Sequence, residues 1–312
     1  MKILAMAAFE ILFNDSLANI LLDTKLSPID NKTILSLIND FEDGSWRYAK
    51  FQNFIWDNIA ETALSVKEKN SLITAPSSSL TEAAKKLRLT DNDKDDKGRG
   101  SELAEIVLYG IMKHYYNALP VVPKIFYKQN AQDFAKGSDS VHIVVHQDNN
   151  FSLWFGEAKF YNSIEDVRLD SIVTSVENSL QTDKLKKENS IITNILDINH
   201  LAIKEDLKTE IIDLLSNRES IDNLKPKLNI PILLLHECEI TKAQTTLTSE
   251  YKESIKEYHK QRAEAYFGKQ IKKISSLHKY SEVKFHIILL PVPLKARIVD
   301  KFISNATHFK AQ

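Results

Sequence analysis

Two short stretches, KGSDSVHIVV over residues 136–145 and WFGEAKF over residues 154–160, decide the fold that this sequence predicts. Apolar and β-branched residues dominate both, which is typical of strands, and the turn residues 148–150 between them predict a β-hairpin. Alternation along the second strand sends Glu157 and Lys159 to the same face. The hairpin then brings Asp139 alongside Glu157. We expect two carboxylates and an amine to converge at the end of a buried hairpin.

Such a group suits metal-assisted hydrolysis of a phosphodiester. Asp139 and Glu157 supply the hard oxygen ligands that Mg²⁺ prefers, with Mn²⁺ as a possible substitute. We expect the backbone carbonyl of Ala158 to be a further metal ligand. A bound metal neutralises the phosphate and lowers the pKa of a water, while the ammonium of Lys159 positions that water.

The helix expected over residues 101–116 precedes this hairpin and carries two further acidic candidates. Glu102 and Glu105 lie three residues apart, on one helical face. We expect Glu105 to complete the site, with Glu102 as the alternative, and the sequence does not decide between them. The bare pattern of an acidic residue, any residue and lysine occurs seven times in the chain. At Glu157 alone it combines an apolar strand with an upstream Gly-Ser-Asp and a glutamate-bearing helix.

The rest of the chain predicts an α/β architecture. From residue 101 the expected order is α-β-β-β-α-(α)-β-α-β, which implies a mixed sheet with helices on both faces. Its strands include residues 124–128 and the continuous apolar runs 228–239 and 283–290. Residues 1–90 are expected to form an α-rich region, with helical spacing at Ile34–Ile38. We expect this region to dock a partner, and residues 91–312 to form the catalytic domain.

Composition excludes several classes of protein. Of the 312 residues, 43% are hydrophobic and 27% are charged, which rules out wholesale disorder. No stretch approaches the roughly 18 uninterrupted apolar residues of a membrane span. A single cysteine, Cys238, excludes an internal disulfide framework and a zinc–thiolate cluster, so we expect a cytoplasmic location.

Overall charge does not predict a nucleic-acid partner, because 41 basic residues face 42 acidic ones. A charged helix expected over residues 249–280 is locally basic. Phosphate contact and a solvated amphipathic helix explain it equally well. On the first interpretation its candidate DNA contacts are Lys256, Lys260, Arg262, Lys269, Lys272 and Lys273.

The helix–Asp–Glu-x-Lys arrangement resembles the PD-(D/E)xK, or restriction-endonuclease-like, nuclease core. Four segments resemble, more specifically, the HamA family of the Hachiman anti-phage defence system: RGSELAEI (99–106), PKIFYK (123–128), KGSDSVH (136–142) and LWFGEAKFY (153–161). The resemblance is dense over residues 99–161 and looser beyond them. Ser138 stands where the motif's name-giving proline would be, a departure that the fold class tolerates.

This resemblance implies a nuclease effector that acts on DNA and is partnered with a superfamily 2 helicase of the HamB type. Asp139, Glu157 and Lys159 correspond to the catalytic core of that superfamily. The alternative is a non-catalytic regulatory or scaffold subunit that keeps the fold and binds a helicase and nucleic acid. The complete Asp, Glu and Lys set favours the enzyme.

Overall fold

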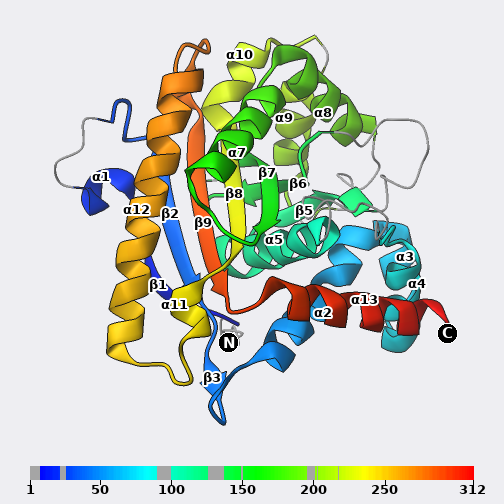
Figure 1. The fold of residues 1–312 in the computed structure, drawn as a ribbon. Coiled ribbons are helices and arrows are strands. Elements are labelled where there is room, and N and C mark those ends of the chain that lie inside the picture. Colours follow the sequence, from blue (N-terminus) through cyan, green and yellow to red (C-terminus); the bar gives the residue numbers. More distant parts are fainter. Residues whose placement is uncertain are drawn as a thin grey trace.

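The structure is a computed structural model, and it describes residues 8–21, 26–89, 100–125, 137–148, 150–194, 201, 203–216 and 218–312. A seven-stranded mixed sheet forms its centre (Figure 1). The strand order across this sheet is β1-β2-β9-β8-β7-β6-β5. Its strands are β1 (Glu10–Ser16), β2 (Lys32–Ile38), β5 (Leu119–Val122), β6 (Ser140–Val145), β7 (Phe151–Tyr161), β8 (Leu228–Glu237) and β9 (Lys284–Val292). The expected mixed α/β sheet is confirmed.

The four inner strands β2, β9, β8 and β7 run parallel, and antiparallel strands close both sides. Strands β8 and β9 are almost continuously apolar and buried along their length, as parallel strands covered on both faces must be. A separate two-stranded ribbon pairs β3 (Phe41–Glu42) with β4 (Ser45–Trp46).

Helices cover both faces of the sheet and form two main apolar cores (Figure 1). One core includes α2 (Tyr48–Ala63), α4 (Pro76–Lys85), α5 (Ser101–Tyr116) and α13 (Lys295–Lys310). The other includes α7 (Asp166–Ser179), α8 (Thr182–Asn194), α9 (Glu205–Leu214), α10 (Ile221–Leu224) and α12 (Ser249–Ile274). Shorter elements are α1 (Leu17–Ile20), α3 (Val66–Ser71), α11 (Glu239–Lys242), η2 (Lys225–Lys227) and η3 (Tyr280–Glu282).

The N-terminal region differs from expectation. Residues 34–38, expected to be helical, belong to strand β2, which pairs in parallel with β9. Both faces of β2 are buried, so its apolar residues do not alternate and their spacing imitates a helix. Strands β1 and β2 therefore belong to the same sheet as the five strands that follow residue 100. Partner docking by this region stays a prediction.

One strand was also expected in the wrong place. The structure puts β5 at Leu119–Val122, whereas we expected a strand at residues 124–128; residues 124 and 125 are helical and 126–128 lie outside the described residues. Helix α5 has the expected bounds, Ser101–Tyr116, and ends on Asn117 with a left-handed backbone. Gly156 of β7 permits close packing of α5, because a Cβ there would lie 2.8 Å from Cδ2 of Leu108.

Candidate active site

The hairpin of β6 and β7 positions the three principal candidates. Its register pairs Ser140 with Gly156, so Asp139 lies next to Glu157. The N–H of Asp139 donates to the carbonyl of Gly156 at 2.7 Å, which extends the ladder by one bond beyond the strand. The expected approach of Asp139 to Glu157 is confirmed.

The side chains of Asp139, Glu157 and Lys159 meet in what we call the open cluster. The Nζ atom of Lys159 lies 2.5 Å from Oε1 of Glu157 and 3.4 Å from Oδ2 of Asp139. That same Oδ2 accepts the N–H of Ala158 at 3.0 Å. Exposed fractions are 8% for the side chain of Glu157, 17% for Asp139 and 28% for Lys159. The cluster is thus partly buried but accessible through its lysine end.

Burial and mutual repulsion set the electrostatics of the open cluster. Burial, and then the negative charge of Asp139, raise the pKa of Glu157 above its ordinary value, although Lys159 opposes them. Burial alone would lower the pKa of Lys159, but the two carboxylates outweigh it and raise that pKa. The lysine is therefore a firmly held ammonium. Both carboxylates of the open cluster contact this ammonium.

Helix α7 covers the face of β7 on which the open cluster lies. The hydroxyl of Ser175, on this helix, donates to Oε1 of Glu157. The same oxygen faces Lys159, so Glu157 is fixed from both its own strand and the covering helix. Sequence reasoning missed Ser175, because nothing in the local pattern of an amphipathic helix singles out one serine.

A second lysine–carboxylate group, the closed cluster, lies beside the same loop. Nζ of Lys124 is 2.7 Å from Oε2 of Glu188 on α8, and these side chains are 0% and 2% exposed. Oε1 of Glu188 accepts the N–H of Ser138 at 2.8 Å. A Cβ on Gly137 would lie only 1.5 Å from that oxygen, so glycine is needed for the approach. Glu188 thus holds the backbone immediately before Asp139.

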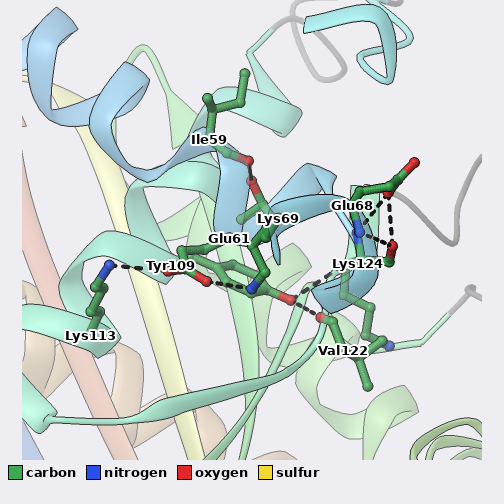
Figure 2. Close-up of polar contacts among 10 residues, drawn as sticks. Ile59, Glu61, Glu68, Lys69, Tyr109, Lys113, Val122 and Lys124 are labelled. Atoms are coloured by element: carbon green, nitrogen blue, oxygen red, sulfur yellow. Dashed lines mark hydrogen bonds and ion pairs between the residues drawn. The ribbon is translucent and has the colours of Figure 1, made fainter. Parts of the chain in front are cut away.

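Tyr109 of α5 secures the other end of the closed cluster (Figure 2). Its hydroxyl donates to the carbonyl of Val122 and accepts the N–H of Lys124 at 3.3 Å. Burial raises the pKa of Tyr109, and the neighbouring carboxylates of Glu105 and Glu188 add to that shift. The hydroxyl therefore stays protonated as a hydrogen-bond donor.

The two glutamates expected from α5 have different surroundings. Glu102 accepts the N–H groups of Arg88 at 2.9 Å and Leu89 at 3.0 Å, so its carboxylate anchors the chain before the helix. Glu105 is buried beside Tyr109. Helix α5 packs on the Gly156 face of β7, opposite the face that carries Glu157. The choice between Glu105 and Glu102 as the helix carboxylate of the site therefore stays a prediction.

Comparison with known families identifies the chain. The family model HamA matches residues 14–306, nearly the whole length. The chain belongs to the HamA family. That membership supports a role in Hachiman anti-phage defence and confirms the resemblance carried by residues 99–161. No curated protein matches the chain.

Metal binding in this HamA-family chain can be judged from its donor atoms. Within the described residues, no three His, Cys, Asp or Glu side chains are grouped to hold a metal. The open cluster offers two carboxylates, and Mg²⁺ is commonly bound through one or two carboxylates with waters and substrate phosphates. Repulsion between Asp139 and Glu157 would be relieved by a cation between them. The oxygen donor set therefore fits Mg²⁺ or Mn²⁺.

The basic helix of this HamA-family chain, α12, packs beside α7 and pairs with it. Arg262 contacts Asp166 at 3.0 Å, and Lys269 contacts Asp170 at 3.0 Å. Further pairs join Lys273 to Glu177 at 3.2 Å and Lys256 to Glu253 at 2.6 Å. Four of the six candidate DNA contacts thus form ion pairs within the chain. This favours the amphipathic-helix interpretation over phosphate contact. No helix in the described part of the chain has the length and apolar character to cross a membrane.

Proposed function

We propose that this HamA-family chain is a Mg²⁺-dependent deoxyribonuclease effector of a Hachiman-type defence complex, controlled by a superfamily 2 helicase partner. The observation that carries the proposal is the convergence of Asp139, Glu157 and Lys159 within 3.4 Å of one another through the lysine nitrogen. The cluster places two carboxylates, one of them 8% exposed, against one ammonium, and a group with shifted pKa values is a mark of functional sites.

Each residue of the open cluster has a role in the proposed hydrolysis. Asp139 and Glu157 would hold the metal through their carboxylates, together with the carbonyl of Ala158. When bound, a divalent ion neutralises phosphate charge and lowers the pKa of a water. Lys159 stays protonated between the carboxylates, so it can orient the attacking water or stabilise the charge that develops on the phosphate. Glu105 of α5, with Glu102 as the alternative, is the proposed further carboxylate.

The loop before Asp139 gives this site its rigidity. Glu188 holds Ser138 through a buried hydrogen bond, and Gly156 holds Asp139. A catalytic constellation must be kept close to its productive geometry, and buried supporting contacts provide that. The closed cluster therefore supports the open one without taking part in chemistry.

Plasmid cleavage tests the proposal directly. The purified chain, alone and with its helicase partner, is incubated with plasmid DNA and Mg²⁺. We expect cleavage that EDTA abolishes, and loss of at least 100-fold in rate for Glu157→Gln and Lys159→Met, because removing one transition-state group costs that much. Glu205→Gln, at an exposed position on α9, is the matched control and should cleave normally.

Three outcomes would contradict parts of this proposal. Folded Glu157→Gln that cleaves at the wild-type rate would remove the open cluster from the chemistry. A wild-type chain that binds the helicase but cleaves no DNA, with or without it, would favour the scaffold subunit. Undiminished cleavage in EDTA would exclude the metal-dependent reaction.

A further inference from the structure

A polar seam runs between β7 and α7 and extends beyond the open cluster. Glu157 and Tyr161 lie on the same face of β7, and Arg168, Ser171 and Ser175 follow one another at helical spacing on α7. Ser175 donates to Glu157, and the hydroxyls of Ser171 and Tyr161 are 3.4 Å apart. At the far end, the guanidinium of Arg168 lies 5.5 Å from the centre of the Tyr161 ring. The helix thus runs along the strand, with arginine at the end away from Glu157.

Arg168 differs from the other cations at this part of the molecule. The basic side chains that α12 directs toward α7 are neutralised by Asp166, Asp170 and Glu177. Arg168 makes no ion pair with any residue that the structure describes. It is half-buried against Tyr161, which is itself only 7% exposed. A cation on an aromatic face is attracted to it while its N–H groups stay available.

The position of Arg168 relative to Lys159 suits an extended polyanion. Lys159 and Tyr161 are two residues apart on β7 and share a face, so Tyr161 lies next to the open cluster. Residues two apart on a strand are separated by roughly 6.6 Å, a spacing similar to that between neighbouring phosphates of one nucleic-acid strand. A phosphate held at Lys159 would therefore have its neighbour near Tyr161, within reach of the guanidinium.

We propose that Arg168 is a substrate-binding residue that contacts the DNA phosphate adjacent to the cleaved one, and that Tyr161 holds its guanidinium in place. This inference rests on the proposed nuclease function. Arginine suits the role because its planar group donates two parallel hydrogen bonds to a phosphate, which a lysine cannot do. The contact reads the backbone and not the bases, so it adds affinity without sequence preference.

Binding and kinetics of arginine variants test this role. The full chain, alone and with its helicase partner, is titrated with a fluorescent DNA duplex in EDTA at several KCl concentrations, and its cleavage kinetics are measured in Mg²⁺. For Arg168→Gln we expect affinity to fall about tenfold, in the range of a charged hydrogen bond. The slope of log affinity against log salt should fall by about one. The KM should rise about tenfold, with kcat within about twofold of the wild type.

Two further variants separate binding from packing. Arg168→Lys keeps the charge and loses the planar fork, so its salt slope should match the wild type while its affinity is intermediate. Arg218→Gln removes the same charge from an exposed position between α9 and α10, and should leave binding and cleavage unchanged. Thermal unfolding of each variant checks that it folds.

The outcomes distinguish this inference from the function on which it rests. A wild-type chain that cleaves, with a folded Arg168→Gln variant whose affinity, salt slope and KM equal those of the wild type, overturns the role of Arg168 alone. An equal loss in Arg218→Gln overturns it too, because the effect would then be general charge attraction. A wild-type chain that neither binds nor cleaves DNA in either state overturns the nuclease function as well.

Discussion

The closed and open clusters both combine lysine with carboxylate and meet at the neighbouring residues Ser138 and Asp139, but they differ in their access to solvent. In the closed cluster one ammonium faces one carboxylate, both sealed from solvent, and the second carboxylate oxygen takes a backbone N–H. In the open cluster two carboxylates share one ammonium that is 28% exposed. The same residue types thus form a structural contact in the closed cluster and, as we propose, the catalytic group in the open cluster. The number of carboxylates and their access to solvent distinguish the two clusters.

This difference between the clusters has a consequence for cation binding. The closed pair is sealed from solvent, whereas the open cluster brings two carboxylates together where a cation can reach them. Burial, and then repulsion from Asp139, raise the pKa of Glu157. Proteins retain unfavourable electrostatics of this kind where it serves a function. Three measurements test the distinction, beginning with the largest expected effect.

Breaking the closed pair should be costly. Lys124→Met leaves the carboxylate of Glu188 buried without its cation, and we expect the free energy of unfolding in urea to fall by about 3–5 kcal/mol. Lys242→Met is the control, because its partner Glu239 is exposed and such pairs contribute about 1 kcal/mol or less. A loss below about 1 kcal/mol for Lys124→Met would mean that the closed cluster is not a structural support.

Mg²⁺ should stabilise the folded protein by binding at the open cluster and not at the closed one. At a free concentration ten times its Kd, a ligand that binds only the folded state raises the free energy of unfolding by about 1.4 kcal/mol. We expect this rise in the wild type, measured by thermal unfolding at constant ionic strength, and its loss in Asp139→Asn. An equal rise in both proteins would place the metal elsewhere.

Removing a carboxylate from the open cluster should relieve repulsion. Glu157 has a folded-state pKa above its ordinary value of 4.5. The folded state therefore binds the proton more tightly than the unfolded state. The resulting penalty is fully present above the raised pKa and disappears as pH falls through it.

At pH 8 we accordingly expect Glu157→Gln to be at least as stable as the wild type, because the variant does not bury a second negative charge beside Asp139. This difference should vanish near pH 4. Urea unfolding of both proteins across this pH range measures it. A loss above about 2 kcal/mol at pH 8 would instead make Glu157 a structural residue like Glu188.

Sequence patterns predicted the elements whose information is local. The alternation of β7, the apolar runs of β8 and β9 and the bounds of α5 all follow from neighbouring residues. The pairing of Asp139 with Glu157 followed because a hairpin joins neighbours in sequence.

Contacts between distant segments could not be predicted in this way. Glu188 meets Lys124 across 64 positions, and within α8 it is one charged residue among several. Strand β2 was taken for a helix, because burial on both faces removes the alternation that marks a strand. The proposed roles of Ser175 and Arg168 depend on their contacts with β7, which the sequence of α7 does not reveal.

The parallel pairing of β2 with β9 also orders events in time. Thr33 lies beside His286, so a strand made early in synthesis must wait for one made near the end. Long-range parallel pairing of this kind slows folding, because a large loop must close before the contact forms. Strand β9 also lies between β2 and β8, so β2 cannot join the rest of the sheet before β9 has been synthesised. A nascent chain on the ribosome therefore carries its open cluster on an unfinished sheet until translation has passed β9.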